Sequence, residues 1–147
     1  LRPFNTFGPF QKDGLEGGVV TIFIKNKLKN EPLKIFGSGN QTRDLLYVED
    51  CAEFIVKASF DEKAVGEIFN AGSGQDISIN ELALMIVKDK NKINHVKHHH
   101  PQAEIQKLVC DYNKAKKILG WKPTTTLLDG IKKTEQWLRE EYKNERA

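Results

Sequence analysis

The sequence predicts an α/β fold, because short apolar segments typical of strands alternate with longer amphipathic segments typical of helices. Glu31-Pro32 and Gly120 mark the ends of two predicted helices. Ser78 followed by Glu81 three residues later is the pattern of a capping box, which starts a helix. The chain has 147 residues and no visible internal repeat, so we expect one α/β domain or part of one.

The chain begins with a segment that has the character of a strand. Residues 2–4 are expected to be the end of a buried strand, because the turn signal Gly8-Pro9 follows them. A helix is expected over residues 17–30. The residues that recur there at helical spacing are Val20, Phe23, Ile24, Lys27 and Leu28.

The middle of the chain predicts three short strands and one helix. Residues 33–36 and 45–48 are expected to be strands, with a turn at 37–40 between them. The segment 49–60 predicts a helix with acidic residues near its positive N-terminus. Its predicted buried face consists of Cys51, Phe54, Ile55 and Ala58. Residues 67–74 are expected to be a strand that runs into a glycine-rich turn.

The last part of the chain predicts three further helices. The capping box begins a helix over 78–90, and residues 95–100 are expected to be a strand. A helix is expected over 111–120, with Asp111 as its cap. The amphipathic segment 129–145 predicts the final helix.

Composition and charge favour an ordinary water-soluble domain. The net charge of +3 comes from lysines scattered through helical segments, so nucleic acid binding is not expected. No apolar run approaches the roughly 20 residues of a membrane span, and no signal-peptide pattern is visible, so a cytoplasmic protein is expected. Cys51 and Cys110 have no CxxC spacing and are expected to be free, buried thiols.

Two glycine-rich segments are candidates for anion binding. In FGSGNQTRD (36–44), the Arg43 guanidinium suits a phosphate, although a turn with Arg43 paired to Asp44 or another acid is favoured by these residues alone. NAGSG (70–74) lacks the G-x-G-x-x-G spacing and is expected to be a structural turn.

A histidine cluster raises the question of a metal site. Its members are His95, His98, His99 and His100. In a strand, His98 and His100 would share one face, but no acid or cysteine lies nearby in the sequence to complete a tetrahedral set. No metal is expected, and solvated or substrate-lining histidines are favoured. These residues predict an α/β anion-binding module without a named reaction.

The order of the motifs is more specific than any one of them. The five blocks are LRPFNTFGP, GGVVTIFI, IFGSGNQTRDLLYVEDCAEFIVKA, IFNAGSG with SINELA, and DYNKAKKILGWKPTTTLLDGI. Together they resemble the C-terminal portion of extended short-chain dehydrogenase/reductases that act on nucleotide sugars. The resemblance is closest to UDP-glucose 4-epimerase-like proteins, with the 4,6-dehydratases next, and it extends to about Tyr142.

The resemblance implies an enzyme in two parts. Family members have an N-terminal Rossmann domain, with a glycine fingerprint for NAD and a Tyr-x-x-x-Lys catalytic pair, and a smaller C-terminal substrate domain. Tyr112 and Lys116 have the spacing of the pair but lie in the 111–120 helix block, so we reject them. Residues 1–147 are therefore expected to be the end of the Rossmann sheet plus a small mixed α/β substrate domain. The catalytic residues would precede Leu1, and this part alone would be inactive.

The resemblance also assigns site residues. It places Pro3 beside the nicotinamide, and Asn5 and Arg43 at the sugar-nucleotide diphosphate. It places Val19, Val20, Ile35 and Phe36 around the nucleobase. Where the family commonly has Arg-Pro-Gly-Asp, this chain has residues 101–104, with sequence Pro-Gln-Ala-Glu. Glu104 could still bind the ribose, and His100 or Gln102 could replace the missing arginine.

By resemblance, the complete enzyme would be an NAD-dependent UDP-sugar 4-epimerase. Its tyrosine would take the proton of the sugar 4-hydroxyl while NAD takes the C4 hydride, which gives a 4-keto sugar that is then reduced on the other face. A 4,6-dehydratase, which first eliminates water across C5–C6, is the alternative. A non-catalytic nucleotide- or RNA-binding derivative of the fold is a further alternative. The complete enzyme is expected to be a homodimer that binds a nucleotide-diphosphate sugar.

Overall fold

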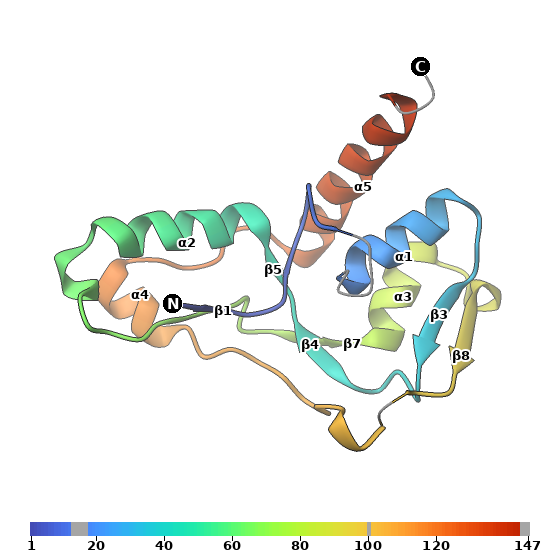
Figure 1. The fold of residues 1–147 in the computed structure, drawn as a ribbon, viewed down its shortest axis with the longest axis horizontal. Helices are drawn as coiled ribbons and strands as arrows, with labels where there is room; N and C mark the ends of the chain where they lie inside the picture. Colours follow the sequence, from blue (N-terminus) through green and yellow to red (C-terminus); the bar gives the residue numbers. More distant parts are fainter. Residues whose placement is uncertain (13–17, 100, 145–147) are drawn as a thin grey trace.

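The computed structural model describes residues 1–12, 18–99 and 101–144, and it confirms the α/β fold (Figure 1). Short strands and helices alternate along the described chain. The strands are β1 (Arg2–Pro3), β2 (Thr6–Phe7), β3 (Leu33–Phe36), β4 (Thr42–Asp44), β5 (Leu46–Tyr47), β6 (Asn70–Ala71), β7 (Asp76–Ser78) and β8 (Ile93–Val96). The helices are α1 (Val19–Leu28), α2 (Val48–Phe60), α3 (Ile79–Val87), α4 (Asn113–Leu119) and α5 (Leu127–Asn144). Three 3₁₀ turns, η1 (Glu62–Ala64), η2 (Lys90–Lys92) and η3 (Pro101–Ala103), complete the set.

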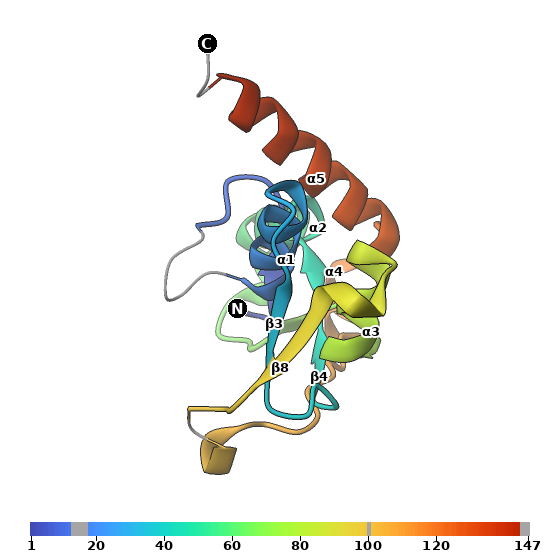
Figure 2. The ribbon, with the colours of Figure 1, turned by 90° about the vertical axis from the view of Figure 1, so that its right-hand side faces the viewer.

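The described strands pair two by two. β1 pairs with β6, β2 with β5, and β3 with β8, all in parallel, whereas β4 and β7 are antiparallel. β3 and β8 lie side by side in both views (Figures 1 and 2). Each parallel pair joins segments that are far apart in sequence, because parallel strands need a crossover connection.

Most of the predicted elements are present, and the differences concern their length and exposure. The strand at 33–36 has its predicted bounds, while those at 45–48, 67–74 and 95–100 are shorter or shifted. β4 and β7 were not predicted. The predicted end of a strand near the start of the chain is present as β1, where Arg2 and Pro3 are exposed and β6 is the described partner.

The helix ends follow local chemistry. The Ser78 hydroxyl accepts from the Glu81 amide while the Glu81 carboxylate accepts from the Ser78 amide, which confirms the capping box of α3. Gly120 ends α4 in the left-handed conformation, with φ of 62°. Asp111 lies one residue before the N-cap of α4, Tyr112, and its carboxylate accepts from the Asn113 amide at 2.8 Å.

The buried face of α2 differs from the predicted one at two positions. Ile55 is exposed, whereas Asp50 is buried along with the other predicted core residues of the helix. The Asp50 carboxylate accepts from the Thr124 hydroxyl at 2.7 Å and from the Thr125 amide at 2.9 Å. These bonds replace the water that a buried carboxylate loses, so Asp50 fixes the loop before α5.

Two groups of buried side chains form separate cores. The cavity core lies among α1, α3, α5 and β3, and consists of Phe7, Val20, Phe23, Ile24, Leu33, Ile35, Leu45, Tyr47, Ile79, Leu82, Ala83, Ile86, Ile131 and Leu138. The α2 core consists of Leu46, Cys51, Phe54, Ala58, Phe69, Ala71, Ala115, Leu119 and Trp121. Cys51 and Cys110 are free and buried, as predicted. Among the described residues, no helix is long and apolar enough to cross a membrane.

The segment that contains β5 lies between the two cores. Leu45 and Tyr47 belong to the cavity core, while Leu46 belongs to the α2 core. Successive side chains of an extended chain point to opposite faces, so this segment forms a wall shared by the two cores. This placement accounts for its continuous apolar sequence, which is typical of a strand buried on both faces.

Candidate functional site

A cavity of about 470 Å³ lies beside the cavity core and collects most of the predicted site residues. Its walls come from β2, the start of α1, β3, β4 and the segment that carries His98 and Glu104. The predicted residues that line it are Asn5, Val19, Val20, Ile35, Phe36, Arg43 and Glu104. The fold thus brings together seven positions that span about 100 residues of sequence.

Three predicted residues are not among those that line this cavity. Pro3 is exposed on β1, and Gln102 is exposed on η3, just before Glu104, which lines the cavity. His100 lies outside the described residues. The cofactor contact of Pro3 stays a prediction, at a position outside this cavity.

The structure adds lining residues that sequence reasoning missed, among them Gln11, Lys34 and Gln41. His98, from the histidine cluster that was expected to be solvated or to line the substrate site, also lines the cavity. Gln11 bridges two walls, since its amide nitrogen donates to the Thr6 carbonyl at 2.8 Å and its amide oxygen accepts from the Thr21 hydroxyl at 2.7 Å. No local sequence signal predicts that bridge.

One wall of the cavity is aromatic and apolar. Phe36 is 41% exposed, and its ring lies 5.1 Å from that of His99 and 6.5 Å from that of His98. Ile35 and Val20 are buried behind this wall. The Gln41 amide donates to the Phe36 carbonyl at 3.1 Å, which holds the end of β3 in place. A planar ring fits such a surface.

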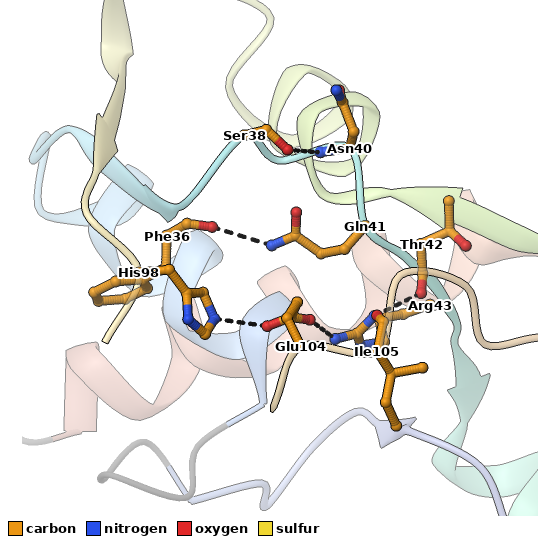
Figure 3. A network of polar contacts seen from close by, with 9 residues as sticks. All are labelled: Phe36, Ser38, Asn40, Gln41, Thr42, Arg43, His98, Glu104 and Ile105. Carbon is orange, nitrogen blue, oxygen red and sulfur yellow. Dashed lines mark hydrogen bonds and ion pairs between the residues drawn. The ribbon is translucent and has the colours of Figure 1, made fainter. Parts of the chain in front are cut away.

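The other wall is charged and centres on Arg43. Figure 3 shows the Glu104 carboxylate between the Arg43 guanidinium and the His98 imidazole. Arg43 forms an ion pair with Glu104, and its Nη1 donates to the carbonyls of Ile105 at 2.7 Å and Thr42 at 2.8 Å. Pairing of Arg43 with an acid other than Asp44 was one of the predicted alternatives, and Glu104 is that acid.

Asp44 has a structural role, unlike its neighbour Arg43, which faces the cavity. Its fully buried carboxylate accepts from the Ser73 amide and hydroxyl at 2.6 and 2.7 Å, and from the amides of Gly74 and Cys110, both at 2.9 Å. NAGSG is therefore a structural turn, as predicted, because its amides donate to a protein carboxylate. Burial, with the charge of Asp44 next in effect, raises the pKa of the Cys110 thiol to about 12.

Strand β4 also holds a segment that passes along the edge of the molecule. Residues 101–110, which we call the strap, run from the β8 side toward α4 (Figure 1). The Thr42 amide donates to the Gln106 carbonyl at 2.9 Å, Arg43 binds the Ile105 carbonyl, and Asp44 binds the Cys110 amide. Three successive residues of β4 thus fix the strap that carries Glu104.

Within the described part of the chain, the glycine-rich turn at 72–74 is not a cradle for a dinucleotide cofactor. The Ser73 and Gly74 amides donate to Asp44, so they are not available to a pyrophosphate. Asn5 lines the cavity, but its side-chain amide donates to the Asp44 carbonyl at 3.0 Å. The cavity instead suits a ligand with a planar ring at one end and an anionic group at the other.

Comparison with known proteins gives consistent matches. Residues 1–72 match the model of the NAD dependent epimerase/dehydratase family. A UDP-N-acetyl-alpha-D-glucosaminuronate decarboxylase of Bacillus cytotoxicus is 37% identical, over 95% of this chain and 46% of that protein.

Two solved structures are similar over almost the whole chain. Pal from Bacillus thuringiensis is 64% identical with a TM-score of 0.92, over 95% of this chain and 45% of that one. UDP-glucose 4-epimerase from Thermotoga maritima, solved with UDP-glucose, is 31% identical with a TM-score of 0.87, over 96% and 45%. The chain thus spans slightly less than half the length of the relatives it matches.

Proposed function

The chain belongs to the NAD-dependent epimerase/dehydratase family, and on that premise we propose that residues 1–147 are the substrate-binding part of a UDP-sugar 4-epimerase. The enzyme would work through a 4-keto sugar. The cavity carries this proposal, because it gathers the seven residues that the resemblance assigns to a nucleotide sugar. The Thermotoga relative solved with UDP-glucose supports the same ligand class.

The two walls of the cavity divide the ligand between them. Phe36 faces the nucleobase, backed by the buried side chains of Ile35 and Val20, and Val19 covers the base from the start of α1. Arg43 binds the diphosphate through its guanidinium, and Asn5 lies at the same end. Holding base and diphosphate fixes where the sugar projects, so this part contributes by positioning.

The chemistry belongs to residues outside this chain. We place residues 1–147 in the C-terminal part of the enzyme, after an N-terminal domain that supplies the NAD site and the Tyr-x-x-x-Lys pair. The coding sequence upstream of Leu1 tests this placement, and its lack of both features would favour a non-catalytic binding derivative. The proposal also includes a homodimeric complete enzyme, which sedimentation of that enzyme tests.

Two other reactions on nucleotide sugars are alternatives within the same family. The 4,6-dehydratase shares the 4-keto intermediate with the epimerase, and the Bacillus cytotoxicus relative is named a decarboxylase. The assigned residues contact base and diphosphate, which these reactions have in common. Product analysis by NMR, with UDP-glucose, UDP-N-acetylglucosamine and UDP-glucuronate as substrates of the complete enzyme, distinguishes the three.

The role of Arg43 can be tested by replacement. In the protein expressed from the complete coding sequence, Arg43→Ala should weaken UDP-glucose binding by about 1.5–3 kcal/mol, because a charge-assisted hydrogen bond is lost. Calorimetric titration measures the change. Arg139→Ala is the matched control, since Arg139 pairs with Glu135 on α5 away from the cavity lining. Unchanged affinity of Arg43→Ala would remove this residue from the site.

A further inference from the structure

We propose that the Glu104 carboxylate acts as a resident anion: it pairs with Arg43 while the site is empty. The diphosphate of the ligand then displaces Glu104 from Arg43 and so frees one end of the strap. The proposal rests on the proposed function, because it concerns the same cavity. It gives Glu104 a role opposite to that of a ribose acceptor: its carboxylate competes with the ligand.

The geometry of the Glu104 carboxylate is the first observation. One oxygen pairs with Arg43, and the other lies 2.6 Å from His98 Nε2 (Figure 3). The side chains of Arg43 and Glu104 are only 20% and 16% exposed, so water screens the pair less than it would on an open surface. Both oxygens of the carboxylate are therefore engaged within the cavity.

The charge of the cavity is the second observation. Among the described residues that line it, the formally charged ones are Lys34, Arg43 and Glu104. Glu104 cancels the charge of Arg43, so the ligand-free wall offers an anion little net attraction at that point. A diphosphate that entered beside Glu104 would meet a like charge at short range, which opposes binding unless the carboxylate leaves.

The anchoring of the strap is the third observation, and it shows what would move. Arg43 contacts the strap at Glu104 and at the Ile105 carbonyl. The bonds from Thr42 to Gln106 and from Asp44 to Cys110 do not involve that guanidinium. If Arg43 turns to a diphosphate, residues 101–105 keep only the contact of Glu104 with His98, while 106–110 stay anchored.

Calorimetric titration of the complete protein tests this inference, with uridine and UDP as ligands of wild type and Glu104→Gln. The glutamine keeps the size of the side chain and removes its charge. We expect Glu104→Gln to bind UDP about three- to tenfold more tightly and uridine with unchanged affinity. Glu104→Ala should change the UDP affinity in the same direction. Glu67→Gln, which breaks the remote Glu67–Lys114 pair, should change neither affinity.

Backbone ¹⁵N relaxation gives a second readout, because it reports mobility directly. The order parameters of residues 102–105 should be lower in ligand-free Glu104→Gln than in wild type, and UDP should lower them in wild type. The order parameters of 106–110 should be unaffected in both comparisons. Higher order parameters of 102–105 on UDP binding would overturn the release of the strap.

The other outcomes separate this inference from the proposed function. Weaker binding of both uridine and UDP by Glu104→Gln would establish a ribose acceptor and overturn the resident anion, as would unchanged UDP affinity. If wild type binds neither uridine nor UDP, the proposed function fails. Titration with inorganic pyrophosphate then decides: tighter binding by Glu104→Gln supports the resident anion, and equal binding or none overturns it.

Discussion

The cavity core and the α2 core have similar buried side chains but support different surfaces. The cavity core backs the cavity and its charged wall. Around the α2 core, large apolar side chains face outward instead: Phe60 is 87% exposed and Val65 is 82% exposed, with Val56 and Ile68 also exposed. If the cavity binds the proposed ligand, ligand binding and structural packing belong to separate regions, which β4 and β5 connect.

The largest expected effect tests that separation in the α2 core. Trp121 is fully buried, packs against Phe54 and Tyr112, and donates its indole N–H to the Asp50 carbonyl at 3.1 Å. Trp121→Ala should lower the free energy of unfolding by about 3–5 kcal/mol, because it leaves a cavity and an unpaired carbonyl. Urea denaturation of the complete protein measures this.

The same variant should leave UDP affinity of the folded protein unchanged. Phe23→Ala is the matched variant in the cavity core, since Phe23 is equally well buried and lines the cavity. It should reduce both stability and UDP affinity. A loss of affinity in Trp121→Ala as large as that in Phe23→Ala would show that the two regions do not function separately.

The second prediction concerns the connection between the regions. Asp44→Asn should cost about 2–3 kcal/mol of stability, because the amide cannot accept the four hydrogen bonds that the carboxylate accepts. It should also speed hydrogen exchange at Cys110, since Asp44 holds the end of the strap. Asp76→Asn is the control at the position that pairs with Asp44 across β4 and β7. Equal losses at the two positions would contradict the assignment.

The smallest effect is expected at the capping box of α3. Ser78→Ala should lower the free energy of unfolding by about 1 kcal/mol, because the Glu81 amide loses its acceptor. Hydrogen bonding from Ser78 lowers the pKa of Glu81 below its ordinary value. A lowered pKa means that this contribution is present above the ordinary pKa and disappears as the pH falls through the lowered one.

Thermal unfolding between pH 7 and pH 3 checks this pH dependence. The difference between wild type and Ser78→Ala should be largest at neutral pH and should shrink in acid. A difference that grows toward pH 3 would contradict the capping role of the Glu81 carboxylate.

Local signals in the sequence predicted the elements whose cause is local. The capping box of α3 and the glycine at the end of α4 depend on neighbouring residues, and the structure confirms them. The apolar segment at 33–36 also predicted its strand correctly, although that strand pairs with the distant β8. β4 and β7 could not be predicted in this way, since each has only three residues and depends on pairing with the other. Strand formation there is a tertiary effect.

Contacts between distant residues explain the remaining differences. Asp44 and Asp50 were not predicted to be buried, because their partners lie 29 to 75 residues away in the sequence. Arg43 and Glu104 are 61 residues apart, and neither position predicts that the two would pair. The resemblance identified seven cavity residues, but it could not indicate that one of them neutralises another.

The shared wall at residues 45–47 makes the chain sensitive to changes in length. Because Leu45, Leu46 and Tyr47 alternate between the two cores, one inserted or deleted residue there would send each side chain to the opposite core. A single-residue length change would therefore damage both regions at once, whereas a point substitution such as Leu46→Val would affect one. Tolerance to insertion should be lowest in this segment, although it carries no residue that we assign to the ligand.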